Sequence, residues 1–346
     1  MVSVWLKTSN SEGAQLTTNQ PNPELEQNIP TEQQSLLDDV LHGLSQNQAT
    51  IPSKYLYDEL GSALFEAITV APEYYVTRAD LDVMDLHLND IATTIGPNAH
   101  VIEFGSGAGS KTLRLLKALK SPIAYSPIEI SETALSASAT HLKSTFPNLL
   151  ISPVLADYTK DIEPKTLDIC HDCQNRIVFF PGSTIGNFEA LQAEDFLRRF
   201  RKIITALAPN VVGGDLIGID LLKPIDTLIA AYDDEAGVTA AFNKNLLARL
   251  NKQLNANFNL DHWVHEAYFN DKLARIEMHL VSAIDQTIII ADRCFNFPAG
   301  KSIHTENSHK YSIQSFSDIA ARCGLRLQQH WTDSKDLFAT CYFIPA

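Results

Sequence analysis

Cysteine is scarce in this sequence, and long apolar runs are missing from it. The five cysteines are odd in number and scattered along 346 residues, which argues against a disulfide framework and favours a reducing compartment. No uninterrupted apolar run reaches the ~18 residues of a membrane-spanning helix, and residues 1–7 lack the apolar core of a secretory signal. These absences predict a cytoplasmic protein with no membrane partner.

Positive charge is the third shortage. Lys and Arg number 27 against 41 for Asp and Glu, which leaves a formal net charge of -14. Such a surface repels a phosphate backbone, so we expect a small-molecule substrate and no nucleic-acid partner. A hydrophobic fraction of 45% supports a sizeable core, and the length suits two domains or one elaborated domain. The composition leaves the oligomeric state open, a monomer included.

A glycine-rich turn is the most informative feature that is present. The apolar run at residues 99–104 is followed by Gly105, Gly107 and Gly109, and then by a helical pattern at residues 112–119. Glycine lets a backbone approach a ligand closely, and the free N–H groups that open a helix favour ligand oxygens. This strand, turn and helix therefore predict a cofactor site.

Three ligand classes use such a turn, and its spacing separates them. A P-loop needs Gly directly before Lys-Ser/Thr, but Ser110 stands before Lys111 and Thr112. The dinucleotide fingerprint needs its third glycine at that same position. The order acidic residue, apolar residue, Gly-x-Gly-x-Gly is met by Glu103, Phe104 and the three glycines. That order resembles the first motif of class I S-adenosylmethionine-dependent methyltransferases.

Acidic residues follow two further apolar strands. The strand predicted at residues 123–130 carries Glu129 near its end, and the strand at 149–155 is followed by Asp157 and Tyr158. Open α/β sheets bind ligands along the carboxyl ends of their strands. We therefore expect both acids on the same sheet edge as the glycine turn, one bonding a ribose diol and the other an adenine amine.

The rest of the pattern predicts a sheet with an insertion. Apolar runs predict core strands at residues 176–180 and 214–222, and a helical segment follows at 224–251. Alternating apolar and polar residues then predict antiparallel strands, at residues 263–269, 274–284 and 287–295. The fold class is therefore α/β: a Rossmann-like class I methyltransferase sheet with an inserted α+β substrate-binding domain.

The domain division follows these segments. The first thirty residues are rich in Asn, Gln, Ser, Thr and Pro, a composition typical of a mobile tail. We divide the chain into a mobile tail at 1–30, the N-terminal helical part of a substrate domain at 31–80, a methyltransferase core at 81–222, a substrate-binding insertion at 223–310 and a return to the core at 311–346.

Two patterns with the spacing of metal ligands are not assigned to a metal. Cys170 and Cys173 lack the second pair that would complete a zinc site. His262 and His265 lie on an expected strand, where residues three apart point to opposite faces. We therefore predict no metal.

Several segments together resemble one family. It is the S-adenosylmethionine-dependent L-histidine Nα-methyltransferases of ergothioneine biosynthesis, whose relatives include fungal methyltransferases of tryptophan derivatives. The resemblance spans roughly residue 31 to the C-terminus, and the combination of segments is more specific than any single motif. The segments are residues 57–65, 72–78, 103–112, 182–187, 232, 242–245, 276–278 and 305–311.

The resemblance implies S-adenosyl-L-methionine as the cofactor and L-histidine as the substrate. The residues that it implies for the cofactor are Glu103, Gly105, Ser106, Gly107, Lys111, Glu129, Asp157 and Tyr158. Glu129 stands where many methyltransferases have Asp, and either carboxylate can bond both ribose hydroxyls.

The resemblance also implies how the two polar ends of histidine are held. Asn187 and Tyr232 would hold the carboxylate, Tyr57 and Tyr74 would lie near the amino group, and Glu306 and Ser308 would bond to the imidazole. Tyr57, Tyr74 and Asn187 form the implied catalytic group. An amide and a phenol can satisfy a carboxylate without burying a fixed cation, and a carboxylate such as Glu306 can accept from an imidazole N–H.

The implied reaction is attack of an amine lone pair on a sulfonium methyl group. A free α-amino group is mostly protonated at neutral pH and must first lose a proton, which tyrosine hydroxyls or a water could relay. The enzyme's main contribution is alignment, with the reacting atoms held ~3 to 3.5 Å apart. The resemblance, and not the spacing of residues, implies three rounds that give trimethylhistidine, hercynine.

Three alternatives stay open. The substrate can be another aromatic amino acid or derivative. Glu306 distinguishes this alternative from histidine methylation, because the resemblance assigns Glu306 to the imidazole. The pair Lys111-Thr112 keeps a P-loop-like nucleotide hydrolase in view. A cofactor-binding module without turnover is the third.

Overall fold

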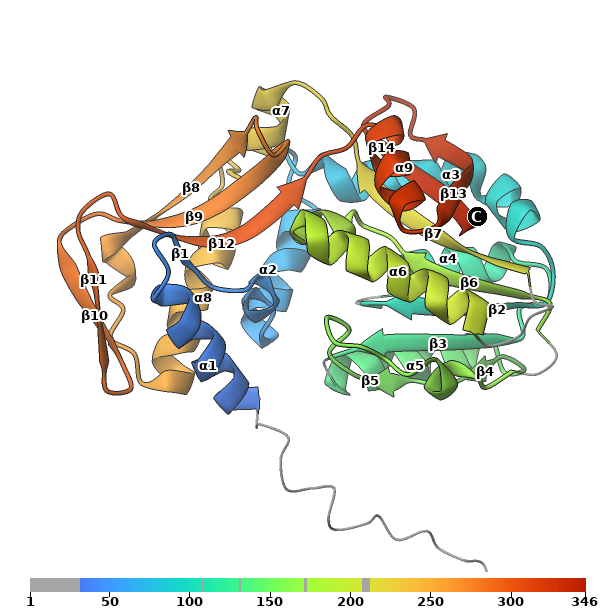
Figure 1. The fold of residues 1–346 in the computed structure, drawn as a ribbon, viewed down its shortest axis with the longest axis horizontal. Coiled ribbons are helices and arrows are strands. Elements are labelled where there is room, and N and C mark those ends of the chain that lie inside the picture. The colour runs from blue at the N-terminus through green and yellow to red at the C-terminus, as the bar shows by residue number, and fades with distance from the viewer. Residues whose placement is uncertain (1–31, 107–108, 131, 171–172, 207–211) are drawn as a thin grey trace, which may run out of the picture.

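The computed structural model describes residues 32–106, 109–130, 132–170, 173–206 and 212–346 (Figure 1). The mobile tail expected at residues 1–30 and the cofactor residue Gly107 lie outside the described residues. No helix in these ranges combines the length and apolar composition that crossing a membrane requires.

A mixed sheet forms the centre of the core. Its strands lie in the order β13-β14-β7-β6-β2-β3-β4, with β5 paired to β3. Strands β2 to β7 are parallel, whereas β14 is antiparallel to both β7 and β13. The strands are β2 (Ala99–Phe104), β3 (Ala124–Glu129), β4 (Leu150–Ile151), β5 (Val154–Leu155), β6 (Asn175–Phe180), β7 (Val212–Asp220), β13 (Leu325–Thr332) and β14 (Phe338–Pro345). This sheet confirms the predicted Rossmann-like α/β class.

The strand order places a ligand edge in the middle of the sheet. The chain moves outward from β2 in one direction through β3 and in the other through β6 and β7. Such a switch point leaves a crevice at the carboxyl ends of the strands. The segments predicted to bind the cofactor follow β2, β3 and β5 at this edge.

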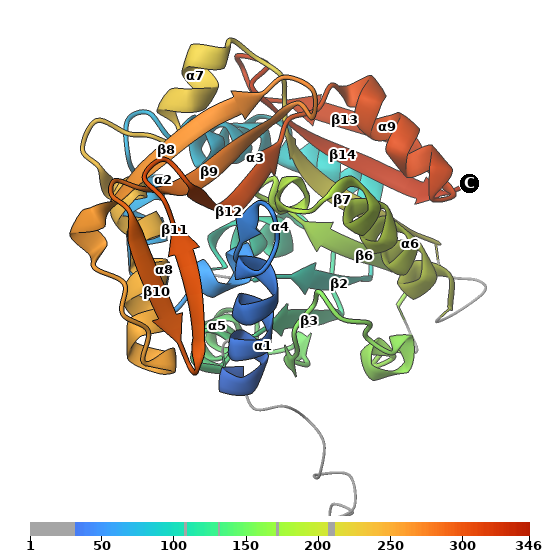
Figure 2. The same ribbon diagram turned by 60° about the vertical axis from the view of Figure 1, so that its left-hand side comes forward.

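Helices cover both faces of the core sheet. One face carries α3 (Tyr75–Ile95), α4 (Ser110–Ala118) and α5 (Glu132–Thr145), and the other carries α6 (Ala190–Ala206) and α9 (Ile313–Arg322) (Figures 1 and 2). The strands supply alternate side chains to the two layers, so that Ile177 packs with the first and Val178 with the second. A strand buried on both faces reads as a continuous apolar run, which is why the core strands were recognisable.

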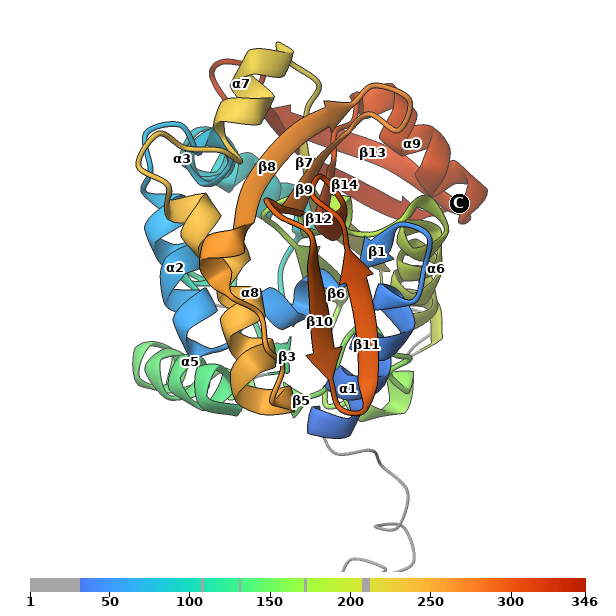
Figure 3. The ribbon, with the colours of Figure 1, turned by 90° about the vertical axis from the view of Figure 1, so that its left-hand side faces the viewer.

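A second sheet lies beside the carboxyl edge of the first. Its order is β1-β12-β9-β8, and α1, α2, α7 and α8 lie around it (Figures 1 and 3). The strands are β1 (Ala49–Thr50), β8 (Trp263–Asn270), β9 (Arg275–Ser282) and β12 (Ser302–His309). The helices are α1 (Glu32–Leu44), α2 (Glu59–Thr69), α7 (Ile225–Ala230) and α8 (Val238–Leu254). Single-turn helices are η1 (Ser53–Leu56), η2 (Pro164–Leu167), η3 (Thr184–Asn187) and η4 (Leu260–His262).

The pattern was wrong about two strands and missed two others, β1 and β12. The single strand expected at residues 149–155 is two short strands, β4 and β5, each paired with β3. The single strand expected at residues 287–295 is a hairpin of β10 (Gln286–Ile290) and β11 (Arg293–Phe297). The chain reverses at Ala291, which adopts a φ of 49°, a conformation that a non-glycine residue adopts only when packing imposes it. Strand β12 was not predicted, because its polar sequence Ser-Ile-His-Thr-Glu-Asn-Ser-His has no strand-like apolar alternation.

Strand β12 joins the two sheets. The chain leaves it at residue 310, and Tyr311 forms a parallel bridge with Leu221 just beyond β7. The N–H of Tyr311 donates to the carbonyl of Asp220 at 2.9 Å, and the N–H of Leu222 donates to the carbonyl of Tyr311 at 2.9 Å. Side chains at the end of β12 are thereby fixed against the carboxyl edge of the core sheet.

Candidate active site

The glycine turn has the backbone that the sequence suggested. Gly105 and Gly109 have φ values of 72° and 68°, and α4 begins directly after Gly109. The N–H of Gly105 donates to the carbonyl of Ile128 at 2.9 Å, which fixes the turn to the neighbouring strand β3. A Cβ atom at Gly105 would lie 3.4 Å from the ring of Tyr158. The turn thus brings Tyr158, a predicted cofactor residue that follows β5, against the backbone that follows β2.

Glu103 lies behind this turn. It is 2% exposed, and one carboxyl oxygen accepts hydrogen bonds from Thr112 and Tyr125, each at 2.5 Å. Burial raises the pKa of Glu103 to about 7, although these two hydrogen bonds and Lys111 oppose the rise. Its described partners belong to α4 and β3, so the carboxyl ties these elements to β2. Its contact with a cofactor stays a prediction.

Lys111 is paired with an acid that the sequence did not single out. Its Nζ lies 2.5 Å from Asp80 of α3, and the N–H of Gly182, after β6, donates to the same carboxylate oxygen at 3.0 Å. Asp80 is 2% exposed. A P-loop lysine has to present its charge to a phosphate, whereas this lysine is neutralised by a buried carboxylate. The pairing weighs against the nucleotide-hydrolase alternative.

The other predicted cofactor residues lie along the same edge. Glu129 accepts from the N–H of Ile130 at 2.9 Å, and Asp157 accepts from the N–H and hydroxyl of Thr159 at 3.0 and 2.6 Å. The second oxygen of Asp157 lies 3.8 Å from Nζ of Lys54 in η1, which links this strand end to the N-terminal helical part.

The edge has the features that a cofactor with hydroxyl and amino groups requires. Gly105 and Gly109, both left-handed, put no side chain at these two points of the turn. The hydroxyls of Ser106 and Ser138 are buried and have no hydrogen-bond partner of good geometry among the described residues. Buried polar atoms are rarely left unpaired in native structures. The residues present therefore fit S-adenosyl-L-methionine, and the bonding of Glu129 to its ribose and of Asp157 to its adenine stays a prediction.

An aromatic cluster is formed by α2, α8 and the segments that precede α2, α3 and α8. Its ring centroids lie 5.4 to 6.3 Å apart. Its members are Tyr57, Phe65, Tyr74, Tyr232 and Phe242. Tyr74 and Tyr232 are each 8% exposed, whereas Tyr57 is 38% exposed. The structure therefore brings together three tyrosines that are far apart in the sequence.

The three phenols stay protonated. Burial raises the pKa values of Tyr57, Tyr74 and Tyr232 well above the usual range, and the negative charge of Glu306 adds to the rise at each of them. They can donate or accept hydrogen bonds, but they cannot serve as phenolate bases at neutral pH. Any proton relay through them must therefore use the intact hydroxyl.

Glu306 and Asn187 lie side by side. The side-chain amide of Asn187 donates to Oε1 of Glu306 at 3.4 Å. Glu306 is 8% exposed, and burial raises its pKa to about 7 against the lowering effect of Lys310. The resemblance placed these residues at opposite ends of the substrate. In this structure the two ends would be bound by adjoining side chains.

A strained turn presents Asn187 to this group. Gly182 and Ser183 have φ values of 78° and 58°, and the hydroxyl of Ser183 accepts from the N–H of Asp220 at 2.9 Å. A Cβ atom at Gly186 would lie 2.9 Å from the backbone oxygen of His309. Only glycine therefore allows η3 to pack this closely against β12.

A cation that the sequence analysis did not single out, Lys310, lies behind Tyr232, one of the two residues predicted to hold the carboxylate. The hydroxyls of Tyr232 and Ser308 are 2.6 Å apart, and Nζ of Lys310 donates to them at 3.1 and 2.7 Å. Lys310 is 2% exposed. The alternating side-chain direction along β12 puts residues 306, 308 and 310 on one side of the strand, a spacing that could have indicated Lys310.

Asp220 holds this cation and was also missed. Its carboxylate accepts from Lys310 at 2.7 Å and from the hydroxyl of Tyr75 at 2.9 and 2.8 Å, and it is paired with Lys223. Asp220 is fully buried. It is the last residue of β7, so its position at a strand's carboxyl end was the available signal.

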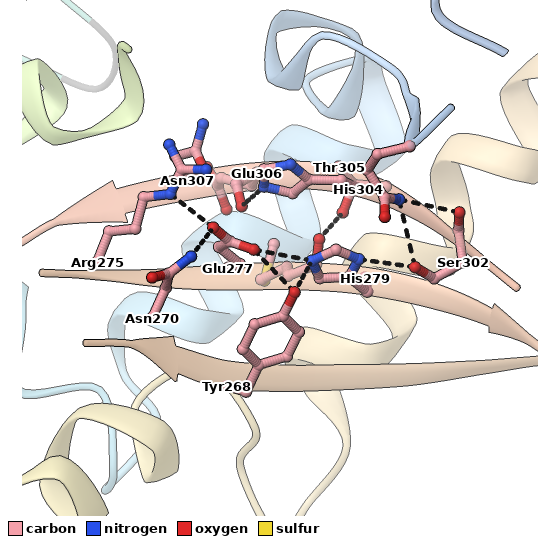
Figure 4. A network of polar contacts seen from close by, with 12 residues as sticks. Tyr268, Asn270, Arg275, Glu277, His279, Ser302, His304, Thr305, Glu306 and Asn307 are labelled. Carbon is pink, nitrogen blue, oxygen red and sulfur yellow. Dashed lines mark hydrogen bonds and ion pairs between the residues drawn. The ribbon is translucent and has the colours of Figure 1, made fainter. Parts of the chain in front are cut away.

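A separate polar network supports β12 from the other side of the second sheet (Figure 4). Ligand-type atoms of Glu277, His279 and His304 lie within 4.8 Å of one another. The two imidazole rings are stacked, with centroids 4.7 Å apart and planes inclined by 8°. Imidazole lone pairs lie in the ring plane, so two stacked rings cannot aim at one ion.

Hydrogen bonds account for the network in Figure 4. Glu277 accepts from Tyr268, Asn270 and Arg275 at 2.7 to 2.9 Å. His304 bonds to the backbone oxygen of Glu306 at 3.0 Å, next to a register shift between His304 and Glu306. These contacts fix the irregular part of β12 from which the Glu306 side chain projects.

The histidine and cysteine side chains with metal-like spacing form hydrogen bonds within the protein. The ring of His265 bonds to the Asn243 amide and to the backbone oxygen of Tyr232, at 2.9 and 2.8 Å. The thiol of Cys173 donates to the carbonyl of Cys170 at 3.2 Å. These contacts fix both side chains without a metal ion.

The fold and the site together define a class of protein. A parallel sheet of this order, with a glycine turn after β2 and acids after β3 and β5, is the architecture of a class I S-adenosyl-L-methionine-dependent methyltransferase. A second sheet placed over the carboxyl edge adds the means to hold a separate acceptor molecule.

The particular family follows from comparison with known proteins. The family model described as histidine-specific, S-adenosyl-L-methionine-dependent methyltransferase matches residues 36–344. The chain belongs to this family. Histidine N-alpha-methyltransferase of Mycolicibacterium smegmatis is 35% identical over 307 residues, which cover 87% of this chain and 92% of that protein.

More distant relatives extend the comparison. Ergothioneine biosynthesis protein 1 of Schizosaccharomyces pombe is 28% identical over 82% of this chain but only 37% of its own length. A solved S-adenosylmethionine-dependent methyltransferase of Clostridium acetobutylicum is 11% identical and covers 83% of this chain and 96% of its own, with a TM-score of 0.41.

Proposed function

We propose that the enzyme transfers methyl groups from S-adenosyl-L-methionine to the α-amino group of L-histidine, and that three transfers give trimethylhistidine, hercynine, for ergothioneine biosynthesis. The observation that carries the proposal is the junction of β12 with β7. There Glu306 lies beside Asn187 and the hydroxyls of Ser308 and Tyr232 lie 2.6 Å apart. These groups match the polar atoms at both ends of histidine.

Each end of histidine has partners of suitable chemistry. Glu306 accepts from an imidazole N–H when it is ionised, and a hydroxyl can donate to the other ring nitrogen or accept from it. Asn187 and Tyr232 donate to the carboxylate. A substrate without an imidazole would leave the buried Glu306 with the Asn187 amide but without the imidazole N–H donor, which costs more free energy than a poor fit does.

The amino group is held between the two halves of the molecule. Tyr57 and Tyr74 keep their protons, so their oxygen atoms can accept a hydrogen bond from the amine while they donate elsewhere. Bound S-adenosyl-L-methionine supplies an electrophilic methyl group on a sulfonium. The protein's own contribution is to hold the amine in line with that group after the amine has lost its proton.

Incubation with S-adenosyl-L-methionine and a panel of amino acids, followed by mass spectrometry, tests the proposal. We expect additions of one, two and three methyl groups on histidine and none on phenylalanine. Equal methylation of tryptophan or a derivative would favour the alternative N-methyltransferase function. No methylation of any amino acid, despite cofactor binding, would favour a binding module.

Two expectations accompany this proposal. The scattered cysteines favour a cytoplasmic location, and the substrate is small enough for a single copy of the chain to hold. Size-exclusion chromatography with light scattering measures the oligomeric state, and a monomer is the expected result.

A further inference from the structure

Lys310 is the buried charge nearest to the predicted substrate residues. Its ammonium group has three acceptors: Asp220 at 2.7 Å, Ser308 at 2.7 Å and Tyr232 at 3.1 Å. An ammonium group has three N–H donors and no acceptor. Its donors are therefore all used, and both hydroxyls receive a hydrogen bond from it.

This arrangement constrains the protons of the two hydroxyls. Tyr232 and Ser308 each accept a hydrogen bond from Lys310, so neither hydroxyl can donate its own proton to Lys310. Their mutual contact at 2.6 Å uses one of the two protons. The other points out of this three-residue cluster. Tyr74 is a further hydrogen-bond partner of Tyr232, so this O–H is available either to Tyr74 or to a bound substrate.

Asp220 lies between two cations. It is paired with both Lys310 and Lys223, and all three side chains are almost fully buried. Glu306 acts on Lys310 and Asp333 acts on Lys223 as further negative charges, so the group as a whole carries no positive excess. What Lys310 contributes is a buried positive charge directly behind the Tyr232 and Ser308 hydroxyls. An α-carboxylate that reaches Tyr232 would lie next to Lys310.

The two lysines differ in what else they contact. Lys223 donates to the hydroxyl of Tyr75 at 2.8 Å and to the carbonyl of Leu221, and neither group is among the predicted substrate residues. Lys310 contacts two of those residues. The two lysines carry the same charge and share the same carboxylate, but only Lys310 contacts the predicted substrate residues. Lys223 is therefore a matched control for Lys310.

We infer that Lys310 is a positioning residue that makes the enzyme select substrates with a free α-carboxylate, because it orients an O–H of the Tyr232–Ser308 pair and supplies the counter-charge behind it. This inference rests on the proposed function, since it presumes that histidine is the substrate. Asp220 holds Lys310 in place, and Lys223 shares this carboxylate without touching the substrate residues.

The test compares L-histidine with L-histidinamide, which keeps the imidazole and the amine but lacks the carboxylate charge. We expect Lys310→Met to lower kcat/KM for histidine by about 100-fold, mainly through KM, as expected when a buried charged partner is removed. The value for histidinamide should change by less than about threefold, so the preference for histidine should collapse. In Lys223→Met the ratio between the two substrates should stay close to that of the wild type.

The pH profile gives a second readout that a purely structural role would not move. Lys310 lowers the pKa of Glu306, whereas Lys223 is not among the causes of its shift. The acidic limb of kcat/KM should therefore move to higher pH in Lys310→Met and stay in place in Lys223→Met. If Lys310→Met does not fold, Lys310→Gln removes the same charge but keeps an amide donor for the neighbouring hydroxyls, and Asp220 keeps Lys223 as its partner. This variant should lose the same preference.

An unchanged ratio in a folded Lys310 variant, or an equal loss of the ratio in Lys223→Met, would overturn the inference and leave the proposed function standing. A wild-type enzyme that does not methylate histidine would overturn the proposed function and this inference together. Thermal unfolding of each variant, followed by circular dichroism, establishes that the compared proteins are folded.

Discussion

The cofactor edge and the substrate group are built in different ways. The cofactor residues come from turns that follow consecutive strands, and the glycine turn alone supplies several of them within ten residues. The substrate group draws on the segments around residues 57, 74, 187, 232 and 306, and none of its pairs is local in sequence. A cofactor shared by many enzymes needs only a local motif, whereas recognition of one acceptor depends on how distant segments pack.

The comparison predicts that substitutions can impair substrate recognition and cofactor binding separately. The largest effect should come from Glu306→Ala, which removes the only carboxylate assigned to the imidazole. We expect kcat/KM for histidine to fall by about 1000-fold, because a site built around a polar partner discriminates strongly once that partner is lost. Calorimetry should give an unchanged affinity for S-adenosyl-L-methionine within about threefold. Retention of histidine turnover by this variant would refute the imidazole assignment.

Gly105→Ala should have the opposite effect and weaken cofactor binding without changing substrate preference. The alanine would have to adopt a φ of 72° with its Cβ 3.4 Å from Tyr158, at a strain of about 1 to 2 kcal/mol. We expect S-adenosyl-L-methionine to bind about 10-fold more weakly, as a loss of this size implies, while the preference among amino acids stays unchanged. Isothermal calorimetry measures the affinity.

Gly300→Ala is the matched control for this variant. Gly300 has a φ of 86°, and nothing lies within 4 Å of an added Cβ. It should lose a similar amount of stability and no cofactor affinity. Equal loss of cofactor affinity in both variants would mean that the effect is global and not local to the turn.

The substrate half should also respond to pH through Glu306. Burial raises the pKa of Glu306 to about 7, and Lys310 opposes the rise. Since the ionised form accepts from the imidazole N–H, kcat/KM for histidine should rise as the pH increases through about 7. In Glu306→Gln the part of this limb that Glu306 causes should disappear.

The same raised pKa affects stability with the opposite sign. A carboxyl group whose folded pKa exceeds its unfolded value stabilises the fold fully below the unfolded value, and this contribution is lost as the pH rises through the folded value. The ligand-free protein should therefore lose some stability between about pH 4.5 and 7. Denaturant unfolding of wild type and Glu306→Gln across this range measures the difference.

The smallest effect concerns the sheet that both halves share. Asp215 of β7 is fully buried, and neither of its carboxyl oxygens has a partner among the described residues. Burial raises its pKa well above the usual range, so ionisation of this carboxyl group opposes folding. Asp215→Asn should raise the free energy of unfolding at pH 7 by about 1 kcal/mol and leave both substrate affinities unchanged. A lower thermal midpoint for this variant would show that the carboxyl has a partner.

The sequence was sufficient wherever a feature was local. The strand at residues 99–104 and the glycine turn were predicted at their observed places, because a strand buried on both faces is continuously apolar and left-handed turns favour glycine. The hairpin at Ala291 and the strand β12 were not predictable in this way. Ala291 carries no turn signal, and β12 is polar because it lines a site and not a core.

The sequence by itself determined the α/β class, the cofactor turn and, through a resemblance between segments, the residues predicted to hold the substrate. Only the tertiary structure decided that Lys111 is neutralised by Asp80 and that Lys310 stands behind Tyr232 and Ser308. The physical reason is that a buried charge must find its partner wherever packing places one. Such partners can lie 90 residues apart, as Lys310 and Asp220 do, and no periodicity in the sequence records them.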